Sequence, residues 1–341
     1  ATVMNALAMQ NALEQLGVAP WAPLEGVSAH TKVDERTGEL MFFNYSKHAP
    51  FMHYGVVDSA GKVVTYIPVP LPGPRLPHDM AFSENYSILN DLPVFWDANL
   101  LSQNIHAARL HKLPSRFAIV PRHGRTEDIR WFEAAPCYVL HFLNAYEDGD
   151  EIVMDGYFQE EPTPRPMAGA PDGFSHLMAY LDEHSFKSKL HRWRFNMRTG
   201  QTAEQRLDDR VLEFGMINPR VAGRKYRYAY STTTKPGWFL FNGFVKHDLE
   251  TGESWNVQLP EGRFASEAPF VPRINAKDED DGYLVSFIID ENTGTSECIL
   301  IDCKRFSDGP VVRIALPHKI SSGTHACWAD RDFIRNGFVA G

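Results

Sequence analysis

A short turn motif recurs along the chain and limits the possible fold more than any other feature. Each copy places an aspartate or asparagine three or four residues before a glycine, at residues 34–38, 58–61, 196–200 and 248–252. The acid or amide side chain opens a turn, and glycine adopts the positive φ angle that the turn requires. Each motif should therefore join two antiparallel strands. Repeated strand, turn and strand is typical of β-propeller blades, and a β-sandwich with similar hairpins is the alternative.

Short runs of β-branched and aromatic residues accompany these turns and predict strands. They lie at residues 40–45, 63–67, 283–288 and 298–301. Aromatic residues make up 12% of the chain, which also contains 23 prolines and 24 glycines, and this composition favours strands and turns. The exception is residues 2–16, where apolar residues at mixed helical spacing precede Gly17 and predict a helix with a glycine C-cap.

Two segments interrupt the strand pattern. Residues 71–77 contain three prolines, which cannot sit in a hydrogen-bonded ladder, so they predict an extended loop. Residues 159–173 are a long insert rich in proline and glycine, and such inserts in compact domains are usually functional or mobile. No linker of clearly different composition divides the chain, so residues 1–341 are predicted to form a single domain.

The charge and cysteine content exclude several classes of protein. The chain has 34 Lys and Arg residues against 43 Asp and Glu residues, and a net charge of -9 argues against a nucleic-acid partner. No apolar stretch reaches the roughly 18 residues that span a bilayer, and the first residues do not resemble a signal peptide. The four scattered cysteines are interpreted as reduced thiols of a cytoplasmic protein, with neither a disulfide framework nor a zinc site.

Four of the 14 histidines stand out by their context. His30, His78, His141 and His325 are each flanked by apolar or small residues at a predicted strand end. A buried imidazole must form a hydrogen bond or bind a metal, because an unsatisfied buried polar group costs about 1–3 kcal/mol. A propeller brings the innermost strand of every blade to one axis, where four such residues could share a metal. For any single histidine, an ordinary hydrogen-bonded imidazole is the alternative.

Seven motifs containing these histidines resemble the carotenoid cleavage oxygenase family. That family includes apocarotenoid oxygenases, lignostilbene dioxygenases and the retinal-pigment-epithelium isomerase. The motifs follow the order of the family and lie at residues 29–39, 78–86, 141–147, 212–218, 266–273, 281–285 and 323–328. Each motif is weak by itself, but seven in the right order form a specific match over residues 28–328.

The resemblance implies a seven-bladed β-propeller with a non-haem Fe(II) on its axis. His30, His78, His141 and His325 fall on the metal-ligand positions of the family. Glu213 and Glu267 fall on positions whose carboxylates accept a hydrogen bond from a ligand histidine and so fix its orientation. Members of the family carry a substantial portion before the first ligand, with a third such glutamate. Because His30 comes almost at once here, we interpret the propeller as incomplete at its N-terminus, with upstream sequence omitted.

The resemblance also implies a reaction, the oxidative cleavage of a conjugated carbon–carbon double bond. The expected substrates are O2 and a lipophilic carotenoid or apocarotenoid held in an apolar tunnel, and the products are aldehydes or ketones. Phe82, Phe142 and Phe270 are tunnel candidates because they neighbour ligand motifs, and core packing is their alternative role. A stilbenoid substrate is the second expectation, and an isomerase or a non-catalytic ligand-binding propeller stays open. A lipophilic substrate also predicts transient membrane contact.

Overall fold

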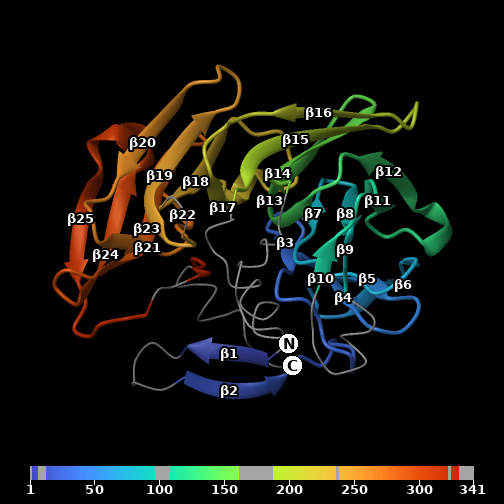
Figure 1. Cartoon of the computed structure of the whole chain (residues 1–341). Helices are drawn as coiled ribbons and strands as arrows, with labels where there is room; N and C mark the ends of the chain where they lie inside the picture. Colours follow the sequence, from blue (N-terminus) through green and yellow to red (C-terminus); the bar gives the residue numbers. More distant parts are fainter. Residues whose placement is uncertain are drawn as a thin grey trace, which may run out of the picture. The chain divides into compact units, whose positions relative to one another are not determined.

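The computed structural model describes residues 2–6, 13–96, 108–160, 187–235, 238–321 and 324–329, and these are mostly β-strands (Figure 1). The all-β prediction is confirmed at this level. The described helices are short 3-10 turns: η1 (Thr126–Asp128), η3 (Pro219–Val221) and η4 (Cys303–Asp308). None of the helical turns in the described part of the chain has the length or hydropathy of a membrane-spanning segment.

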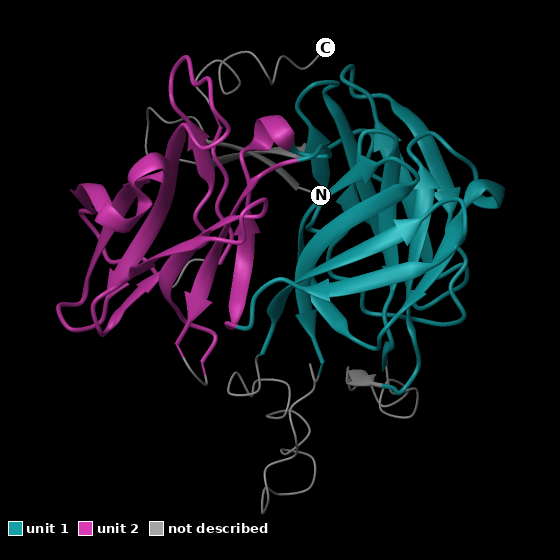
Figure 2. Ribbon diagram, turned by 90° about the horizontal axis from the view of Figure 1, so that it is seen from above, with its two compact units in different colours: residues 1–209, 222–225 teal, residues 210–221, 226–341 magenta. Residues whose placement is uncertain are grey.

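The chain divides into two compact units, which Figure 2 colours separately. Unit 1 contains residues 1–209 and 222–225, and unit 2 contains residues 210–221 and 226–341.

Unit 1 contains three antiparallel sheets of four strands each, and within each sheet the strands pair in the order in which they follow along the chain. The first sheet consists of β3 (Lys32–Asp34), β4 (Glu39–Tyr45), β5 (Met52–Val57) and β6 (Val63–Pro68). The second consists of β7 (Ala81–Phe82), β8 (Tyr86–Asp91), β11 (Ser115–Pro121) and β12 (Arg130–Ala134). The third consists of β13 (Tyr138–Asp148), β14 (Glu151–Gln159), β15 (Lys189–Asn196) and β16 (Thr202–Arg206). A separate two-stranded pair is made by β9 (Val94–Trp96) and β10 (Ala108–Leu110).

Strand β11 is buried on both faces and connects the cores on either side of the second sheet. Phe117 and Ile119 belong to a core shared with the third sheet. Ala118 and Val120 belong to a core shared with the first sheet. Successive side chains of a strand point to opposite faces, so this alternation requires the second sheet to lie face to face between the other two.

Unit 2 contains one nine-stranded sheet built from two antiparallel four-stranded runs. The first run is β17 (Leu212–Met216), β18 (Tyr228–Thr234), β19 (Phe241–Asp248) and β20 (Ser254–Gln258). The second is β22 (Phe270–Pro272), β23 (Gly282–Asp290), β24 (Thr295–Asp302) and β25 (Pro310–Ala315). Strand β21 (Arg263–Ala265) pairs with both β19 and β23 and so joins the two runs.

All four predicted turns join antiparallel strands, as expected, and the four predicted strands are found as β4, β6, β23 and β24. The turn glycines have φ angles of 73° to 78°. In the turn before β6, the Asp58 carboxylate accepts the N–H of Ala60 at 3.0 Å. A fifth turn of this kind, from Asp290 to Gly294, joins β23 and β24 and was not predicted. Local side-chain hydrogen bonds therefore set the hairpins, as the motif implies.

The predicted helix at residues 2–16 is wrong. The described residues of this segment form a hairpin of β1 (Thr2–Ala6) and β2 (Leu13–Val18), with Val3 paired to Gly17. At about 100° per residue, the six-residue step from Leu7 to Leu13 turns the second side chain roughly 120° away from the first. The apolar residues therefore share no helix face, and pairing between strands satisfies the backbone instead.

The two predicted loops have different outcomes. Residues 71–77 are non-strand apart from one isolated bridge at Arg75, so the extended loop is confirmed. Most of the predicted insert, residues 161–173, lies outside the described residues.

Candidate metal centre

Three of the four predicted histidines come together in unit 1. His30 lies two residues before β3, His78 lies three residues before β7, and His141 lies within β13. Each position belongs to the first strand of its sheet or to the segment that leads into that strand. Because the three sheets lie face to face, their first strands deliver the three imidazoles to one place.

The spacing of the three rings suits a shared metal ion. The Nε2 atoms of His30 and His78 are 3.0 Å apart. The ring centroid of His141 lies 4.9 Å from that of His30 and 5.2 Å from that of His78. One potential ligand nitrogen from each ring lies within 4.8 Å of the others. Burial lowers the pKa of His30 to about 3, since it and the neighbouring His141 and Lys32 outweigh the opposing effect of Asp79, so this ring is a neutral donor at physiological pH.

His141 reaches this cluster from a β-bulge in β13. The register with β14 shifts between Val139 and Phe142 and again beyond Phe142, so β13 carries extra residues at this point. A bulge bends its strand and redirects a side chain, which explains how a ladder residue joins the cluster. Gly156 lies opposite the bulge, where an added Cβ would be 2.9 Å from the Phe142 ring and 3.2 Å from the His141 carbonyl oxygen. The bulge therefore requires glycine on β14.

The buried carboxylate of Asp79, for which no role was predicted, lies against this cluster. Asp79 is 1% exposed and pairs with Lys32 at 2.8 Å. Burial alone would raise the pKa of Asp79, but Lys32, His30 and His141 together hold it below its ordinary value, so the group is ionised. Its signal in the sequence is a single acidic residue that follows His78 and precedes three apolar residues, which indicates a buried charge with a partner.

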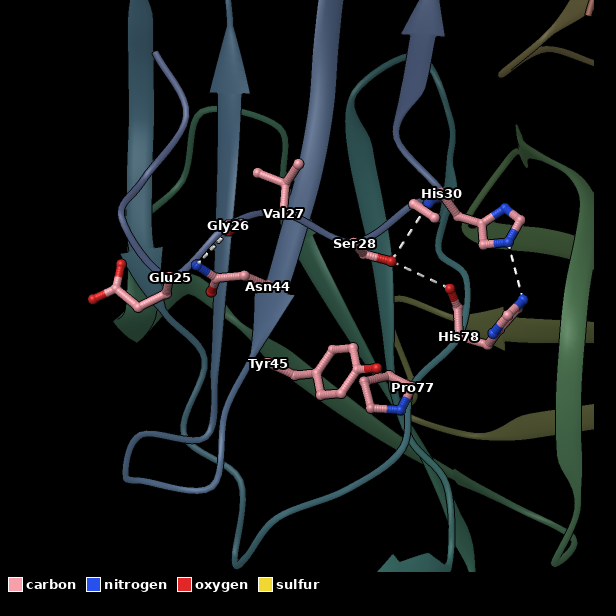
Figure 3. A pocket seen from close by; sticks show the side chains of 10 residues that line it. Glu25, Gly26, Val27, Ser28, His30, Asn44, Tyr45, Pro77 and His78 are labelled. Atoms are coloured by element: carbon pink, nitrogen blue, oxygen red, sulfur yellow. Dashed lines mark hydrogen bonds between the residues drawn. The ribbon is translucent and has the colours of Figure 1, made fainter. Parts of the chain in front are cut away.

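A cavity of about 450 Å³ opens beside His30 and His78 (Figure 3). The Ser28 hydroxyl donates to the His78 carbonyl at 3.3 Å and accepts the His30 N–H at 3.4 Å, so it joins the two histidine segments at the cavity wall. Tyr45 and Asn44 also line the cavity. The residues that line the cavity therefore include polar side chains as well as apolar ones.

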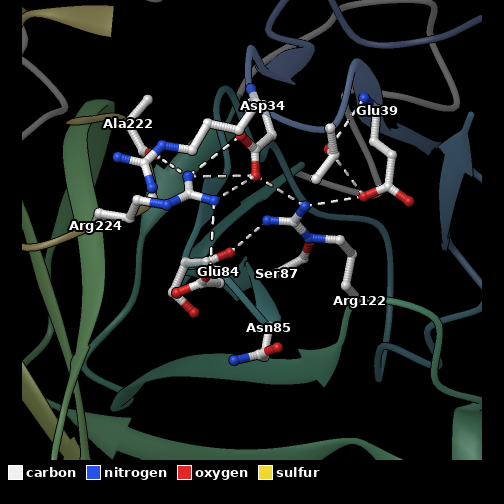
Figure 4. Close-up of polar contacts among 12 residues, drawn as sticks. Asp34, Glu39, Glu84, Asn85, Ser87, Arg122, Ala222 and Arg224 are labelled. Carbon is white, nitrogen blue, oxygen red and sulfur yellow. Dashed lines mark hydrogen bonds and ion pairs between the residues drawn. The ribbon is translucent and has the colours of Figure 1, made fainter. Parts of the chain in front are cut away.

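A polar network around Asp34 fixes strand β3, which follows the His30 segment in the chain (Figure 4). The buried Asp34 carboxylate accepts hydrogen bonds from Arg122 at 3.0 Å and Arg224 at 3.2 Å. Arg122 also donates to Glu39 at 2.9 Å and to the Ser83 carbonyl at 2.7 Å. Burial raises the pKa of Asp34, but the Arg36 N–H and the two guanidinium groups outweigh it and leave that pKa below its ordinary value. This network ties β3 to the second sheet.

The fourth predicted histidine lies in unit 2 beside one of the predicted glutamates. Glu267 Oε2 is 3.4 Å from His325 Nδ1 and accepts the N–H of Ala326 at 2.8 Å. The Glu267 N–H donates to the Thr324 carbonyl at 3.1 Å. A carboxylate at Nδ1 favours the tautomer that keeps this proton, which leaves Nε2 as the donor atom toward a metal.

Glu213 is also in unit 2, fully buried at a bulge of β17. The register with β18 shifts between Glu213 and Met216, and Phe214 adopts a φ angle of 49°. A positive φ in a bulky residue is strained, and such strain is concentrated at functional sites. The Phe214 ring packs edge-on against His325, with centroids 5.2 Å apart. Glu213 and His325 therefore flank the same phenylalanine.

The three predicted tunnel residues are all buried in hydrophobic cores. Phe82 belongs to the core between the first and second sheets, and Phe142 belongs to the core between the second and third. Phe270 belongs to the core of unit 2. Phe142 contacts Phe117 and Trp193 in edge-on geometry. These contacts support the alternative role of core packing.

Comparison with known proteins shows the family to which the chain belongs. A family model described as retinal pigment epithelial membrane protein matches residues 2–330. The chain belongs to this family, with the carotenoid cleavage oxygenases. It is 37% identical over 324 residues to carotenoid 9,10(9',10')-cleavage dioxygenase 1 of Pisum sativum, a match that covers 89% of this chain and 58% of that protein.

Solved structures of the carotenoid cleavage oxygenase family share the fold. The lignostilbene dioxygenase of Pseudomonas brassicacearum has a TM-score of 0.81 at 26% identity, covering 94% of this chain and 70% of that one. The apocarotenoid oxygenase of Synechocystis has a TM-score of 0.84 at 22% identity, covering 96% and 70%. The chain spans less than two thirds of the length of the relative from Pisum sativum, since the match covers 58% of that protein.

Proposed function

We propose that this chain is the metal-binding part of a non-haem iron dioxygenase that cleaves a conjugated double bond of a carotenoid or apocarotenoid. The observation that carries the proposal is the cluster of three imidazoles in unit 1, with ligand nitrogens within 4.8 Å of one another. Imidazole suits Fe(II), and a neutral donor set leaves the metal its full charge. The relative from Pisum sativum, named a carotenoid 9,10-cleavage dioxygenase, supports this substrate class.

In this proposal His30, His78, His141 and His325 hold one Fe(II) ion. Glu267 orients His325 through Nδ1, and Glu213 accepts a hydrogen bond from another ligand histidine. Iron, when bound, supplies the activation of O2 for addition of both oxygen atoms across the double bond, which gives two carbonyl products. The residues of the chain fix the ligand tautomers and position the substrate. No protein nucleophile or general base is required.

We further propose that the two units together form one β-propeller with the metal on its axis. The four-stranded antiparallel runs and the face-to-face packing of the sheets of unit 1 support this arrangement. The first strand of each run carries, or closely follows, a predicted site residue, as the innermost strand of a blade would: His30, His78 and His141 in unit 1, and Glu213 and Glu267 in unit 2.

A stilbenoid substrate is the second candidate. Tyr45 and Asn44 are among the residues that line the cavity beside His30 and His78, and a lining with polar side chains suits a phenolic substrate better than a hydrocarbon. The structural relative from Pseudomonas brassicacearum, named a lignostilbene dioxygenase, supports this candidate.

The test combines metal content with oxygen labelling. The purified chain, loaded with Fe(II) without oxygen, is expected to bind about one iron per chain, as a single shared site requires. Substitution of any of the four histidines by alanine should abolish binding. His191→Ala is the matched control for His141, because the two histidines are 7% and 6% exposed but His191 pairs with Glu204 outside the cluster. Iron that survives the four substitutions would refute the site.

Cleavage itself is tested on the iron-loaded protein with ¹⁸O2 and either an apocarotenoid or a stilbene. Label in both carbonyl products supports the dioxygenase, and the substrate that is cleaved decides between the two candidates. Iron binding without labelled product would leave an isomerase or a ligand-binding protein as the better description.

A further inference from the structure

The carboxylate of Asp79 is in contact with donors from several segments of unit 1. Its Oδ1 atom accepts the N–H of Met80 at 2.7 Å and lies 2.8 Å from the Lys32 ammonium. Its Oδ2 atom accepts the N–H of Phe142 at 2.8 Å and a hydrogen bond from Lys32 at 3.0 Å. Both oxygens are therefore occupied, and the plane of the carboxylate is fixed by partners on two sides.

These partners belong to the segments that carry the three histidines. Lys32 is two residues after His30, and Asp79 directly follows His78. The Phe142 N–H directly follows His141, inside the bulge of β13. One buried carboxylate thus connects all three ligand segments, across 47 residues to Lys32 and 63 residues to Phe142.

We propose that Asp79 is a positioning residue that holds the three histidine segments at the spacing a metal ion requires. The proposal rests on the metal site proposed above and adds a determinant of its geometry. Asp79 acts through the backbone of β13 and the side chain of Lys32, not by touching the metal or the substrate.

The chemistry of the contacts explains why this position needs a carboxylate. Lys32, Met80 and Phe142 all present donors, so the group among them must accept on both oxygens. An ionised aspartate does so, whereas an asparagine would aim its amide N–H₂ at a donor on one side. The Asp79–Lys32 pair is also neutral overall, so it adds no net charge beside the metal. Its contribution is therefore geometric.

The bulge makes the Phe142 contact the critical one. β13 is the edge strand of its sheet, and at the bulge its pairing with β14 is irregular. A buried backbone N–H needs an acceptor, and Asp79 supplies it. Without that acceptor, the segment around His141 loses the contact that fixes it relative to His78.

The test compares Asp79→Asn with Asp248→Asn. Asp248 is similarly buried, at 2% exposed, and likewise accepts hydrogen bonds from several donors, Arg227 at 3.0 Å and the Glu250 N–H at 3.0 Å, but it lies in a turn of unit 2 that carries none of the proposed ligand histidines. Both variants should lose stability to a similar degree. Only Asp79→Asn is expected to weaken Co(II) binding, by about 10- to 100-fold, the loss typical of groups that orient metal ligands, with a shifted Co(II) absorption spectrum. Equal affinity for Asp79→Asn and the unsubstituted protein, or an equal loss in Asp248→Asn, would overturn the proposal.

A second variant and a metal-free measurement keep the outcome decisive. Lys32→Met removes one partly exposed partner and should weaken Co(II) binding in the same direction by a smaller factor. A crystal structure of metal-free Asp79→Asn, or of Lys32→Met if the first variant does not fold, should show the His141 ring displaced from the other two. Rings retained at their present spacing would overturn the positioning role, whether or not the protein binds metal. Failure of the unsubstituted protein to bind metal would instead refute the proposed function.

Discussion

Replacing Glu267 by glutamine tests how the proposed fourth ligand is held. Glu267 Oε2 accepts the Ala326 N–H at 2.8 Å and lies 3.4 Å from His325 Nδ1. Glutamine keeps one acceptor oxygen but loses the charge. Hydrogen bonds to charged groups contribute about 1.5–3 kcal/mol and those between neutral groups about 0.5–1.5 kcal/mol, so the expected loss is about 1–1.5 kcal/mol. At about 1.4 kcal/mol per tenfold change, this corresponds to a roughly 5- to 12-fold weaker affinity for metal.

The assay is a titration of the metal-free protein with Co(II) without oxygen, in competition with a chelator. The Co(II) absorption band reports both the affinity and the coordination geometry. Glu267→Ala removes both acceptor contacts and releases the tautomer of His325, so its loss of affinity should exceed that of Glu267→Gln and approach 100-fold.

Glu279→Gln is the control for a general effect of losing a carboxylate in unit 2. Glu279 accepts the N–H groups of Arg227 at 2.9 Å and Tyr228 at 2.7 Å, which is a comparable set of contacts away from His325. It should lower the free energy of unfolding without changing Co(II) affinity. A Glu267→Gln protein that binds Co(II) within twofold of the unsubstituted chain would refute the role assigned to Glu267.

Two further predictions concern the bulge and the acid stability of a turn. Gly156→Ala should cost about 1–3 kcal/mol of stability by overpacking, because the new Cβ meets the Phe142 ring at 2.9 Å, and it should weaken Co(II) binding through His141; unchanged denaturant unfolding and Co(II) titration curves would contradict this. The hydrogen bond from Arg227 lowers the pKa of Asp248 to about 2, so the stability from this pair is fully present above about pH 4 and is lost as the pH falls through about 2. Asp248→Asn should keep the turn but lose about 1 kcal/mol near pH 7, because solvent screens the exposed Arg227 partner, and the difference from the unsubstituted protein should vanish below about pH 2 in unfolding measured against pH. A difference that persists undiminished about one pH unit below the folded pKa of Asp248 would refute the ion-pair origin.

The hairpins were predictable because their determinants are local. In the turn at Asp58, the side chain accepts the N–H of a residue two positions along, and Gly61 supplies the positive φ angle. Everything needed to form such a turn lies within five residues, so a sequence pattern suffices. The helix predicted at residues 2–16 was wrong for the opposite reason. The pairing of Val3 with Gly17 depends on a second strand, and the spacing of apolar residues in the sequence does not show which segment will pair with which.

The candidate site also contains residues that the sequence could predict and residues that it could not. The histidines were found because their residue type limits the available chemistry and because they lie in motifs that resemble a known family. Asp79 also lies in one of those motifs, but its partners Lys32 and Phe142 are distant in the sequence. A buried charge is visible in a sequence as an anomaly in an apolar run, whereas its partner is not. Roles that depend on pairing between distant segments therefore had to come from the structure.

Bulges explain how a regular sheet can present such residues at all. The backbone of a residue in a regular strand is hydrogen-bonded to its neighbours, so its side chain must point to one face of the sheet or the other. His141 and Glu213 both lie at points where the first strand of a run loses register with its neighbour. In each case the extra residues redirect the side chain, and in each case the irregular backbone takes a side-chain acceptor: Asp79 for the Phe142 N–H and Glu213 for the Phe214 N–H at 2.6 Å. A carboxylate beside a bulge thus satisfies the backbone that the bulge disrupts, which allows a rigid sheet to hold a ligand histidine or its acceptor at a fixed position.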